Sequence, residues 1–346
     1  MIAFLSLPKN YVLKWRGGHV ILKAPIKMFF QAKIKQGKVL EELKLETKQS
    51  LFCPVCERET QSKYVRKYRG KSELFNKNRL YQCLECRVVF VNPLPSSSEL
   101  DQYYKINWRT DTSIHTESNA MDMVLKIHSD QRCDYLIRHN ILSPCSKVLD
   151  VGSGDGYFLQ SLQNKGFKNV DFFAIEPNPK CFQKLKALGI NTIDSLQEIS
   201  ERNFDLITLG ETLEHISEPI PFLESIMELV NNGGHIYIDV PERDDTHKEL
   251  FEPHTLFYSK ESLLNLVEKM NLKVVHVTGF GVKRGNWIFP KSLLHRGLCK
   301  IRKLLSQAFV RETENKKLQK HFLNLYKFDR EGDEGWWVRI ILQVEK

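Results

Sequence analysis

The 346-residue sequence contains no uninterrupted apolar run of the roughly 18–20 residues that a membrane-spanning helix needs. Its first ten residues place no positive charge before a short apolar stretch and offer no small-residue cleavage site, so we do not expect a secretory leader. Internal repeats and low-complexity tracts are also missing. Hydrophobic residues make up 42% of the chain, which is enough for a buried core and excludes global disorder. We therefore expect a cytoplasmic protein, with peripheral contact to the inner face of a membrane as an alternative.

Charge is distributed unevenly along the chain. Residues 1–90 carry 19 Lys and Arg against 7 Asp and Glu, residues 91–280 carry 17 against 28, and residues 281–346 carry 15 against 7. Basic ends therefore flank an acidic middle. Such ends could bind phosphate in RNA, in nucleotide-sugars or on a membrane surface, and solvated basic helices would have the same composition.

Four of the eight cysteines form two close pairs, Cys53–Cys56 and Cys83–Cys86, with 26 residues between the pairs. In a reducing compartment two such CxxC pairs indicate a metal site rather than disulfides. Four thiolates complete a tetrahedron and leave no open position, so the sequence predicts structural zinc. The other four cysteines (Cys133, Cys145, Cys181 and Cys299) are single, and we expect small buried side chains there.

A glycine-rich turn follows a short apolar run at Val148–Val151. The turn contains Gly152, Ser153, Gly154 and Gly156, and a helical pattern continues from Tyr157 to Gly166. This pattern predicts a buried parallel strand, a turn and a helix. Glycines in such a turn let a ligand approach the backbone and the helix N-terminus.

The spacing separates this turn from a dinucleotide site, which would have the pattern G-x-G-x-x-G. Here the pattern is G-x-G-x-G, and Asp150 precedes it at the end of the strand. A carboxylate there would repel a pyrophosphate but favour an ammonium or sulfonium group. Glu176 ends the next strand, 20 residues after Gly156, where it can accept hydrogen bonds from two ribose hydroxyls. These positions therefore favour a positively charged nucleoside without phosphate, and S-adenosylmethionine is such a molecule.

Asp150–Gly156 together with Glu176 resemble motif I and the ribose-binding acid of the class I S-adenosylmethionine-dependent methyltransferases. Residues Phe204–Pro219 resemble the fourth strand of that family with its "LEH…P" continuation, and Asn231–Pro241 resemble its fifth strand. The resemblance implies further cofactor-binding positions after the second, third and fourth strands: Pro177, Asp194, Ser195, Gly210 and Leu213.

The cysteine pairs, Val88–Pro95 and a helix ending in Tyr103–Tyr104 resemble the N-terminal module of sugar methyltransferases. Phe251–Ser259 is similar to the "YHEH…YFS" segment of zinc-containing sugar C-methyltransferases, which implies that His254 is the general base. His215 is the second candidate, and Glu214 and Glu211 are weaker ones. Either histidine could instead be a buried residue that tethers its loop. The chain differs from that segment at Phe251 and Pro253 and lacks the long C-terminal domain of the group. These differences count against methylation of carbon and leave O-methylation of a sugar or related hydroxyl open.

The expected fold is α/β, with a Rossmann-like, seven-stranded methyltransferase sheet, an N-terminal zinc-binding module and a helical insertion before the last strand. The expected helices are 179–188, 218–230 and 259–270, and the expected last strands are 272–277 and 337–344, with the final one antiparallel. The expected parts are a basic extension (1–50), the zinc-binding module (51–92), a linker and helical lid (93–144), the cofactor-binding core (145–280), a basic helical insertion (281–333) and the final core strand (334–346).

These observations predict an S-adenosylmethionine-dependent methyltransferase that acts on a sugar-containing acceptor, either a small molecule or lipid-linked. An RNA methyltransferase that grips phosphate with its zinc module and basic flanks is the alternative. Against it, the Asn/Asp-Pro-Pro-Tyr/Phe segment of amino-group methylases is absent after the fourth strand. A third possibility is a non-catalytic scaffold that retains the fold, which would bind the cofactor weakly or not at all.

Overall fold

The computed structural model describes residues 12–16, 19–23, 48–106, 119–143, 146–246, 248, 250–281, 331–332 and 335–346. The chain divides into two compact units, residues 1–49 and residues 50–346. In the first unit, β1 (Val12–Arg16) and β2 (His19–Lys23) form an antiparallel hairpin. The described residues leave out the rest of the basic extension, residues 107–118 of the expected linker and lid, most of the insertion at 281–333, Cys145 and Cys299. Within the described part of the chain, no helix combines the length and apolar character that crossing a membrane requires.

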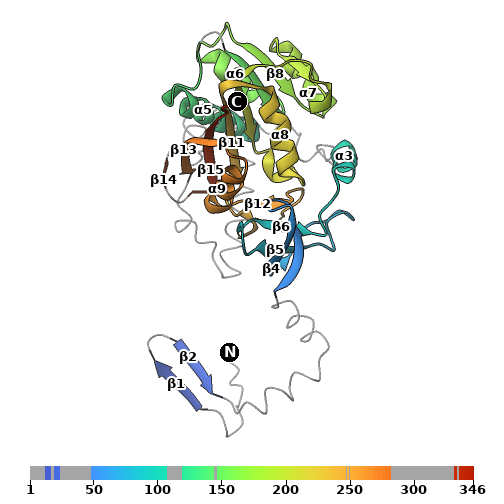
Figure 1. Cartoon of the computed structure of the whole chain (residues 1–346), viewed down its shortest axis with the longest axis vertical. Coiled ribbons are helices and arrows are strands. Elements are labelled where there is room, and N and C mark those ends of the chain that lie inside the picture. The colour runs from blue at the N-terminus through green and yellow to red at the C-terminus, as the bar shows by residue number, and fades with distance from the viewer. Residues whose placement is uncertain are drawn as a thin grey trace. The chain divides into compact units, whose positions relative to one another are not determined.

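A mixed sheet organises the second unit (Figure 1). Its strand order is β14-β13-β15-β11-β10-β7-β8-β9. The strands are β7 (Lys147–Val151), β8 (Asp171–Ile175), β9 (Asn191–Ile193), β10 (Phe204–Gly210), β11 (Val230–Pro241), β13 (Lys273–Phe280), β14 (Glu331–Gly332) and β15 (Trp337–Gln343). Strands β7 to β11 pair in parallel, whereas β15 runs antiparallel between β11 and β13. The predicted α/β sheet with an antiparallel last strand is therefore confirmed, and the two-residue strand β14 adds an eighth member.

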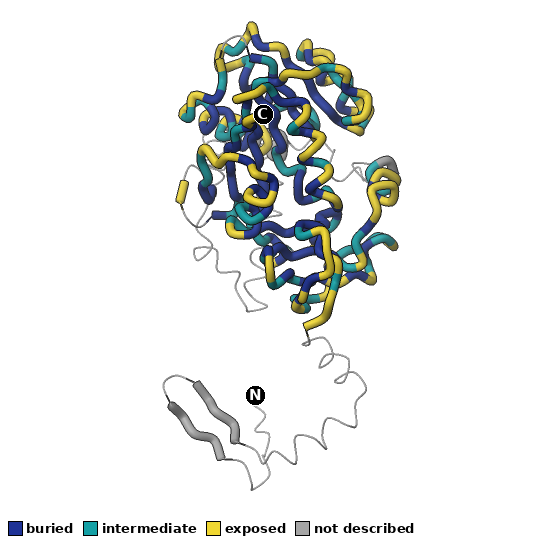
Figure 2. Tube along the Cα trace, in the orientation of Figure 1, coloured by how far each residue is buried: buried dark blue, intermediate teal, exposed yellow. Residues whose placement is uncertain are grey.

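Most of the sheet is buried, as the dark blue of its trace shows (Figure 2). Its strand residues alternate between two cores, one on each face, and helices contribute to both cores. One core contains α5 (Asn119–Arg138), α6 (Tyr157–Asn164) and α7 (Pro179–Ala187), and the other contains α8 (Pro219–Leu229) and α9 (Lys260–Lys269). Along β7, for example, Val148 faces the first core and Leu149 the second. Helix α5 buries Tyr135 and Leu136 completely, so it is part of the first core as well as a wall of the site.

A second, antiparallel sheet holds the cysteine pairs. Its order is β12-β6-β5-β4-β3, with β3 (Gln49–Cys53), β4 (Arg58–Lys67), β5 (Arg79–Cys83), β6 (Val89–Asn92) and β12 (Leu256–Phe257). The strand β12 comes from the segment that follows the large sheet in sequence, yet it pairs with β6 through Leu256 and Phe90. The small sheet therefore contains one strand from beyond the expected zinc-binding module, which was predicted to end at residue 92.

Helix α3 (Ser97–Ile106) follows the cysteine module and begins with a reciprocal cap. The Ser96 hydroxyl accepts a hydrogen bond from the Glu99 backbone (3.3 Å), and the Glu99 carboxylate accepts one from the Ser96 backbone (2.8 Å). Ser96 therefore caps this helix. The helix carries Tyr104 to the wall of the cavity described below.

Candidate functional site

The turn between β7 and α6 has the backbone that its glycines predict. Gly152, Gly154 and Gly156 all adopt left-handed conformations, with φ of 76°, 56° and 77°. A Cβ atom on Gly152 would lie 2.6 Å from the Thr212 hydroxyl oxygen, so the turn packs closely against the segment after β10. The backbone amide of Gly152 donates to the carbonyl of Ile175 (2.8 Å), which fixes the turn to the end of β8.

Glu176 stands directly after β8, and its side chain is held by two backbone groups. Its Oε2 atom accepts a hydrogen bond from the Gly154 amide (2.7 Å), and its Oε1 atom accepts one from the Asn178 amide (2.9 Å). The residue is only 5% exposed. Each carboxylate oxygen can accept a second hydrogen bond, so the fixed carboxylate can still bind a pair of ligand hydroxyls.

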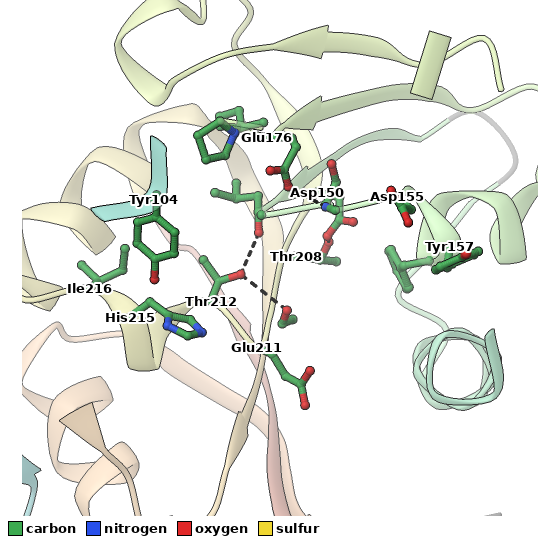
Figure 3. A pocket seen from close by; sticks show the side chains of 18 of the residues that line it. Tyr104, Asp150, Asp155, Tyr157, Glu176, Thr208, Glu211, Thr212, His215 and Ile216 are labelled. Carbon is green, nitrogen blue, oxygen red and sulfur yellow. Dashed lines mark hydrogen bonds between the residues drawn. The ribbon is translucent and has the colours of Figure 1, made fainter. Parts of the chain in front are cut away.

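Asp150 ends β7 and is fully enclosed at the same edge of the sheet. Thr208, on the neighbouring strand β10, donates its hydroxyl to Asp150 Oδ1 (2.5 Å). Burial raises the pKa of Asp150 to about 6, against the opposing effects of the Thr208 hydrogen bond and the charge of Arg132. Figure 3 shows that Asp150 and Glu176 approach the same part of the cavity from adjacent strands.

A cavity of about 400 Å³ opens at this edge of the sheet. Eight of the residues predicted from sequence line it: Asp150, Gly152, Ser153, Gly154, Glu176, Pro177, Gly210 and His215. Five others are not in its lining: Gly156, Asp194, Ser195, Leu213 and His254.

The local structure explains why these five residues are not in the cavity lining. Gly156 is the N-cap of α6, where a Cβ would lie 2.7 Å from the Leu185 side chain. Leu213 is completely buried in the core, whereas Asp194 is exposed after β9 and Ser195 is half-buried. His254 lies behind His215, as described below.

Several cavity residues carried no sequence signal. Arg132, on α5, points its guanidinium toward Gly210, where a Cβ would lie 3.1 Å from Nη1. Its Nε atom is 2.8 Å from Asp239 Oδ2, and its Nη2 atom is 3.8 Å from Glu211 Oε2. The Glu211 carboxylate also accepts a hydrogen bond from Trp337 (2.8 Å). Because the partners of Arg132 come from two segments far from it in the sequence, a local pattern could not have identified it.

Two histidines meet beside the cavity. His215 belongs to the short helix η2 (Leu213–His215) and lines the cavity next to Tyr104 (Figure 3). The rings of His215 and His254 contact each other edge to face, with centroids 4.6 Å apart. Burial, together with the neighbouring His254 and Lys248, keeps the pKa of His215 well below its ordinary value. The structure therefore brings both predicted bases together and places His215 nearer the ligand space.

Glu214 is buried against the same histidines. Its backbone carbonyl accepts a hydrogen bond from the Thr255 amide (2.9 Å), which ties η2 to the segment that carries His254. The carboxylate has no hydrogen-bond partner among the residues that the structure describes, and burial raises its pKa well above the ordinary value. Ligand atoms of Glu214, His215 and His254 lie within 4.8 Å of one another, so this group is one of two in the described residues that could hold a metal ion.

The four cysteines of the small sheet form the other group. The Sγ atoms of Cys53 and Cys86 are 3.5 Å apart, and those of Cys56 and Cys83 are 3.8 Å apart. A tetrahedral zinc ion with Zn–S bonds of about 2.3 Å would have sulfur–sulfur separations of about 3.8 Å. The cluster also packs into the large core, since Lys269 of α9 donates to the Val55 carbonyl (3.0 Å). The donor set and its spacing therefore fit zinc.

Comparison with known proteins identifies the part of the chain that carries this cavity. Residues 128–277 match the family model described as a methyltransferase domain. The ubiquinone biosynthesis O-methyltransferase of Vibrio cholerae is 26% identical over 157 residues, covering 38% of this chain and 63% of that protein. The corresponding enzyme of Aliivibrio fischeri is 30% identical over 131 residues, covering 36% and 53%. The chain thus spans less than two thirds of the length of these relatives.

Solved structures with a similar fold share little sequence identity with this chain. An S-adenosylmethionine-dependent methyltransferase of Thermotoga maritima, described as a possible histamine N-methyltransferase, has a TM-score of 0.46 and 15% identity, covering 71% of this chain and 100% of that one. The plantazolicin methyltransferase BpumL has a TM-score of 0.42 and 17% identity, covering 71% and 94%. The family match assigns residues 128–277 to a methyltransferase domain, and the four-cysteine cluster precedes this domain.

Proposed function

We propose that the protein transfers a methyl group from S-adenosylmethionine to a hydroxyl of a sugar-containing acceptor. The match of residues 128–277 to a methyltransferase domain supports this proposal. The observation that carries the proposal is the pair of buried carboxylates, Asp150 and Glu176, at the edge of adjacent parallel strands beside a glycine turn. Two carboxylates suit a cationic nucleoside and repel a pyrophosphate.

We assign the cofactor contacts as follows. Glu176 accepts hydrogen bonds from the ribose hydroxyls, because its carboxylate is already fixed by two backbone amides. Asp150 provides negative charge beside the ammonium and sulfonium groups. On the family pattern, Asp194 and Ser195 are assigned to the adenine and Gly210 to the methionine part. Leu213, which is completely buried, supports the segment after β10 from the core and has no assigned ligand contact. When bound, S-adenosylmethionine would supply a methyl group on a positively charged sulfur, and the sulfur would keep the electron pair of the C–S bond as the acceptor oxygen forms its bond to the methyl carbon.

A hydroxyl acceptor must lose its proton, and His215 is the group that we propose to take it. His215 lines the cavity, and its lowered pKa keeps it neutral at pH 7 and therefore able to accept a proton. His254, the first choice from sequence, lies behind it. Oxygen as the acceptor atom is supported by the relatives, which are named as O-methyltransferases. The sugar rests on the resemblance of residues 251–259 to sugar methyltransferases.

We further propose that Cys53, Cys56, Cys83 and Cys86 hold one structural zinc ion. Four sulfur ligands leave no open coordination position, so this ion would stabilise the small sheet rather than take part in chemistry. The basic stretch 1–90, with 19 Lys and Arg against 7 Asp and Glu, favours RNA as the second candidate acceptor.

A methyl-transfer screen tests the proposal. The full-length protein is incubated with methyl-labelled S-adenosylmethionine and, in parallel, with nucleotide-sugars, lipid-linked sugars and RNA. We expect label in the sugar fraction with the wild type, and a loss of at least about 100-fold with His215→Ala, which removes the proton acceptor. Label only in RNA would replace the sugar with the second candidate. Absence of S-adenosylmethionine binding by calorimetry would overturn the function altogether.

A further inference from the structure

Thr208 is a buried hydroxyl in an otherwise apolar stretch of strand β10. Its neighbours Leu206, Ile207 and Leu209 are completely buried in the two cores, and Thr208 itself is 2% exposed. A buried hydroxyl is costly unless it makes a hydrogen bond. The side chain also lines the cavity, where neither the assigned cofactor contacts nor the proposed proton transfer involves it.

The register of the sheet places Thr208 beside Asp150. The two residues are Cα partners in the parallel pair of β7 and β10. Thr208 Oγ1 lies 2.5 Å from Asp150 Oδ1 but 3.5 Å from the carbonyl oxygen of Leu149. A hydroxyl has one proton to donate, and a charged acceptor at the shorter distance forms the stronger bond. The proton of Thr208 is therefore directed to the Asp150 carboxylate.

Two charged groups face Asp150 from other elements, and neither replaces this hydrogen bond. Arg132 on α5 favours the ionised carboxylate, and Glu176 after β8 opposes it. The Arg132 guanidinium is already paired with Asp239 (2.8 Å). Among the described residues, Thr208 makes the one hydrogen bond of the Asp150 side chain, and this bond uses Oδ1. The second oxygen, Oδ2, is therefore available to a ligand in the cavity that Asp150 lines.

We propose that Thr208 is a positioning residue: its hydroxyl holds Oδ1 of Asp150, leaves Oδ2 for the cofactor and keeps the carboxylate ionised where the cation binds. Without the hydroxyl, no direct hydrogen bond would offset the burial of Asp150, and the carboxylate would take up a proton at higher pH. The inference rests on the proposed function for its effect on cofactor binding, whereas proton uptake by Asp150 can be measured on the unliganded protein.

The first test follows the Asp150 carboxyl carbon by ¹³C NMR in the unliganded full chain, with ¹³C-labelled aspartate and with Asp150→Asn to assign the signal. We expect a pKa of about 6 in the wild type. Thr208→Val removes the hydroxyl and keeps the branched shape, so the pKa should rise by about one unit or more. Thr208→Ser keeps a hydroxyl and should restore most of the wild-type value. An unchanged pKa in Thr208→Val overturns the proposal.

Calorimetry with S-adenosylmethionine gives the second readout. The Kd of Thr208→Val, divided by the Kd of the wild type, should be at least about fivefold larger at pH 6 than at pH 8. The amino group of the cofactor itself titrates equally with both proteins and cancels in this ratio. A purely structural role for Thr208 would give the same ratio at both pH values, and that result would overturn the proposal.

Thr212→Val is the matched control. Thr212 lines the same cavity, but its hydroxyl donates to the Val151 carbonyl (2.9 Å) rather than to a carboxylate. Its loss should therefore change the Kd by the same factor at pH 6 and at pH 8. If Thr212→Val changes the pH dependence as much as Thr208→Val does, the effect does not come from the Thr208 hydrogen bond and the proposal is wrong.

If Thr208→Val does not fold, Thr208→Ala carries both tests, because it also removes the hydroxyl and adds no atom. Failure of the proposed function gives a different result. The wild type would then bind no S-adenosylmethionine at any pH, while the pKa of Asp150 in the unliganded protein would still show whether Thr208 keeps the carboxylate ionised.

Discussion

Glu176 links the glycine turn to the proposed ribose contact through its two backbone hydrogen bonds. Glu176→Ala removes the acceptor for the Gly154 amide as well as that for the ligand hydroxyls. We expect the affinity for S-adenosylmethionine to fall by about 1.5–3 kcal/mol, the range for a lost hydrogen bond to a charged group. Isothermal titration calorimetry measures this directly. Asp171→Ala, at the exposed opposite end of the same strand, is the control and should bind as the wild type does.

Asp150 makes cofactor binding depend on pH. Its pKa of about 6 lies above the ordinary 3.8, so the folded protein takes up a proton near pH 6 that the unfolded chain takes up only near pH 4. Below pH 6 the carboxylate becomes neutral and attracts the cationic cofactor less. We expect the Kd for S-adenosylmethionine to rise by up to about tenfold per pH unit below pH 6.

The same proton has the opposite effect on the unliganded protein. Between pH 6 and pH 4 the folded state binds more protons at Asp150 than the unfolded state does, so this residue's contribution to the free energy of unfolding increases as the pH falls. Calorimetric titrations from pH 5 to pH 8 on wild type and Asp150→Asn separate the two effects. Asp150→Asn should bind S-adenosylmethionine more weakly than the wild type, and its Kd should not change near pH 6. If the Kd of the variant still changes near pH 6, another group is responsible for the pH dependence.

At the scale of elements, the turn between β7 and α6 depends on glycine at Gly152. Gly152→Ala introduces left-handed strain of about 1–2 kcal/mol. It also pushes against Thr212, whose hydroxyl donates to the Val151 carbonyl (2.9 Å). Gly189→Ala provides the control, because Gly189 has a similar φ of 72° but no heavy atom within 4 Å of the added Cβ.

We therefore expect Gly152→Ala to lower the free energy of unfolding by more than Gly189→Ala does, with a difference of about 1 kcal/mol for the disturbed Thr212 hydrogen bond. Urea unfolding followed by circular dichroism measures both values. Equal losses would mean that the turn has room for a side chain and that the close approach to Thr212 is not a packing constraint.

Elements with strong local patterns were predictable from the sequence. Strand β7, its turn and α6 follow from an apolar run, three glycines and helical periodicity, and Glu176 follows from the end of the next strand. Contacts between distant segments left no such pattern. The position of Arg132 depends on Asp239, 107 residues away, and the short strand β12 exists only because β6 pairs with it. The sequence likewise could not show that His215 lines the cavity whereas His254 does not.

At the scale of the whole molecule, the small sheet supports the proposed proton acceptor through β12. Cys83→Ser removes one of the four sulfur ligands, so we expect lower zinc content and a loosened small sheet. Because β12 pairs with β6, residues 251–258 should lose protection along with residues 49–92, whereas β7 and β8 should keep theirs.

Hydrogen–deuterium exchange with mass spectrometry measures this protection, and elemental analysis measures the zinc. The control is Cys181→Ser, which changes a buried cysteine of the opposite core outside the cluster. Retained protection of residues 251–258 in a zinc-free Cys83→Ser protein would show that β12 does not depend on the metal.

The position of β15 has a consequence for how the protein is made. Residues 337–343 insert between β11 and β13, so the two strands on either side have no direct ladder with each other. On the ribosome, β13 emerges many residues before the strand that joins it to the sheet. The nascent chain therefore carries an open sheet edge until synthesis passes residue 343, and chaperones that shield such edges have their longest access during this interval.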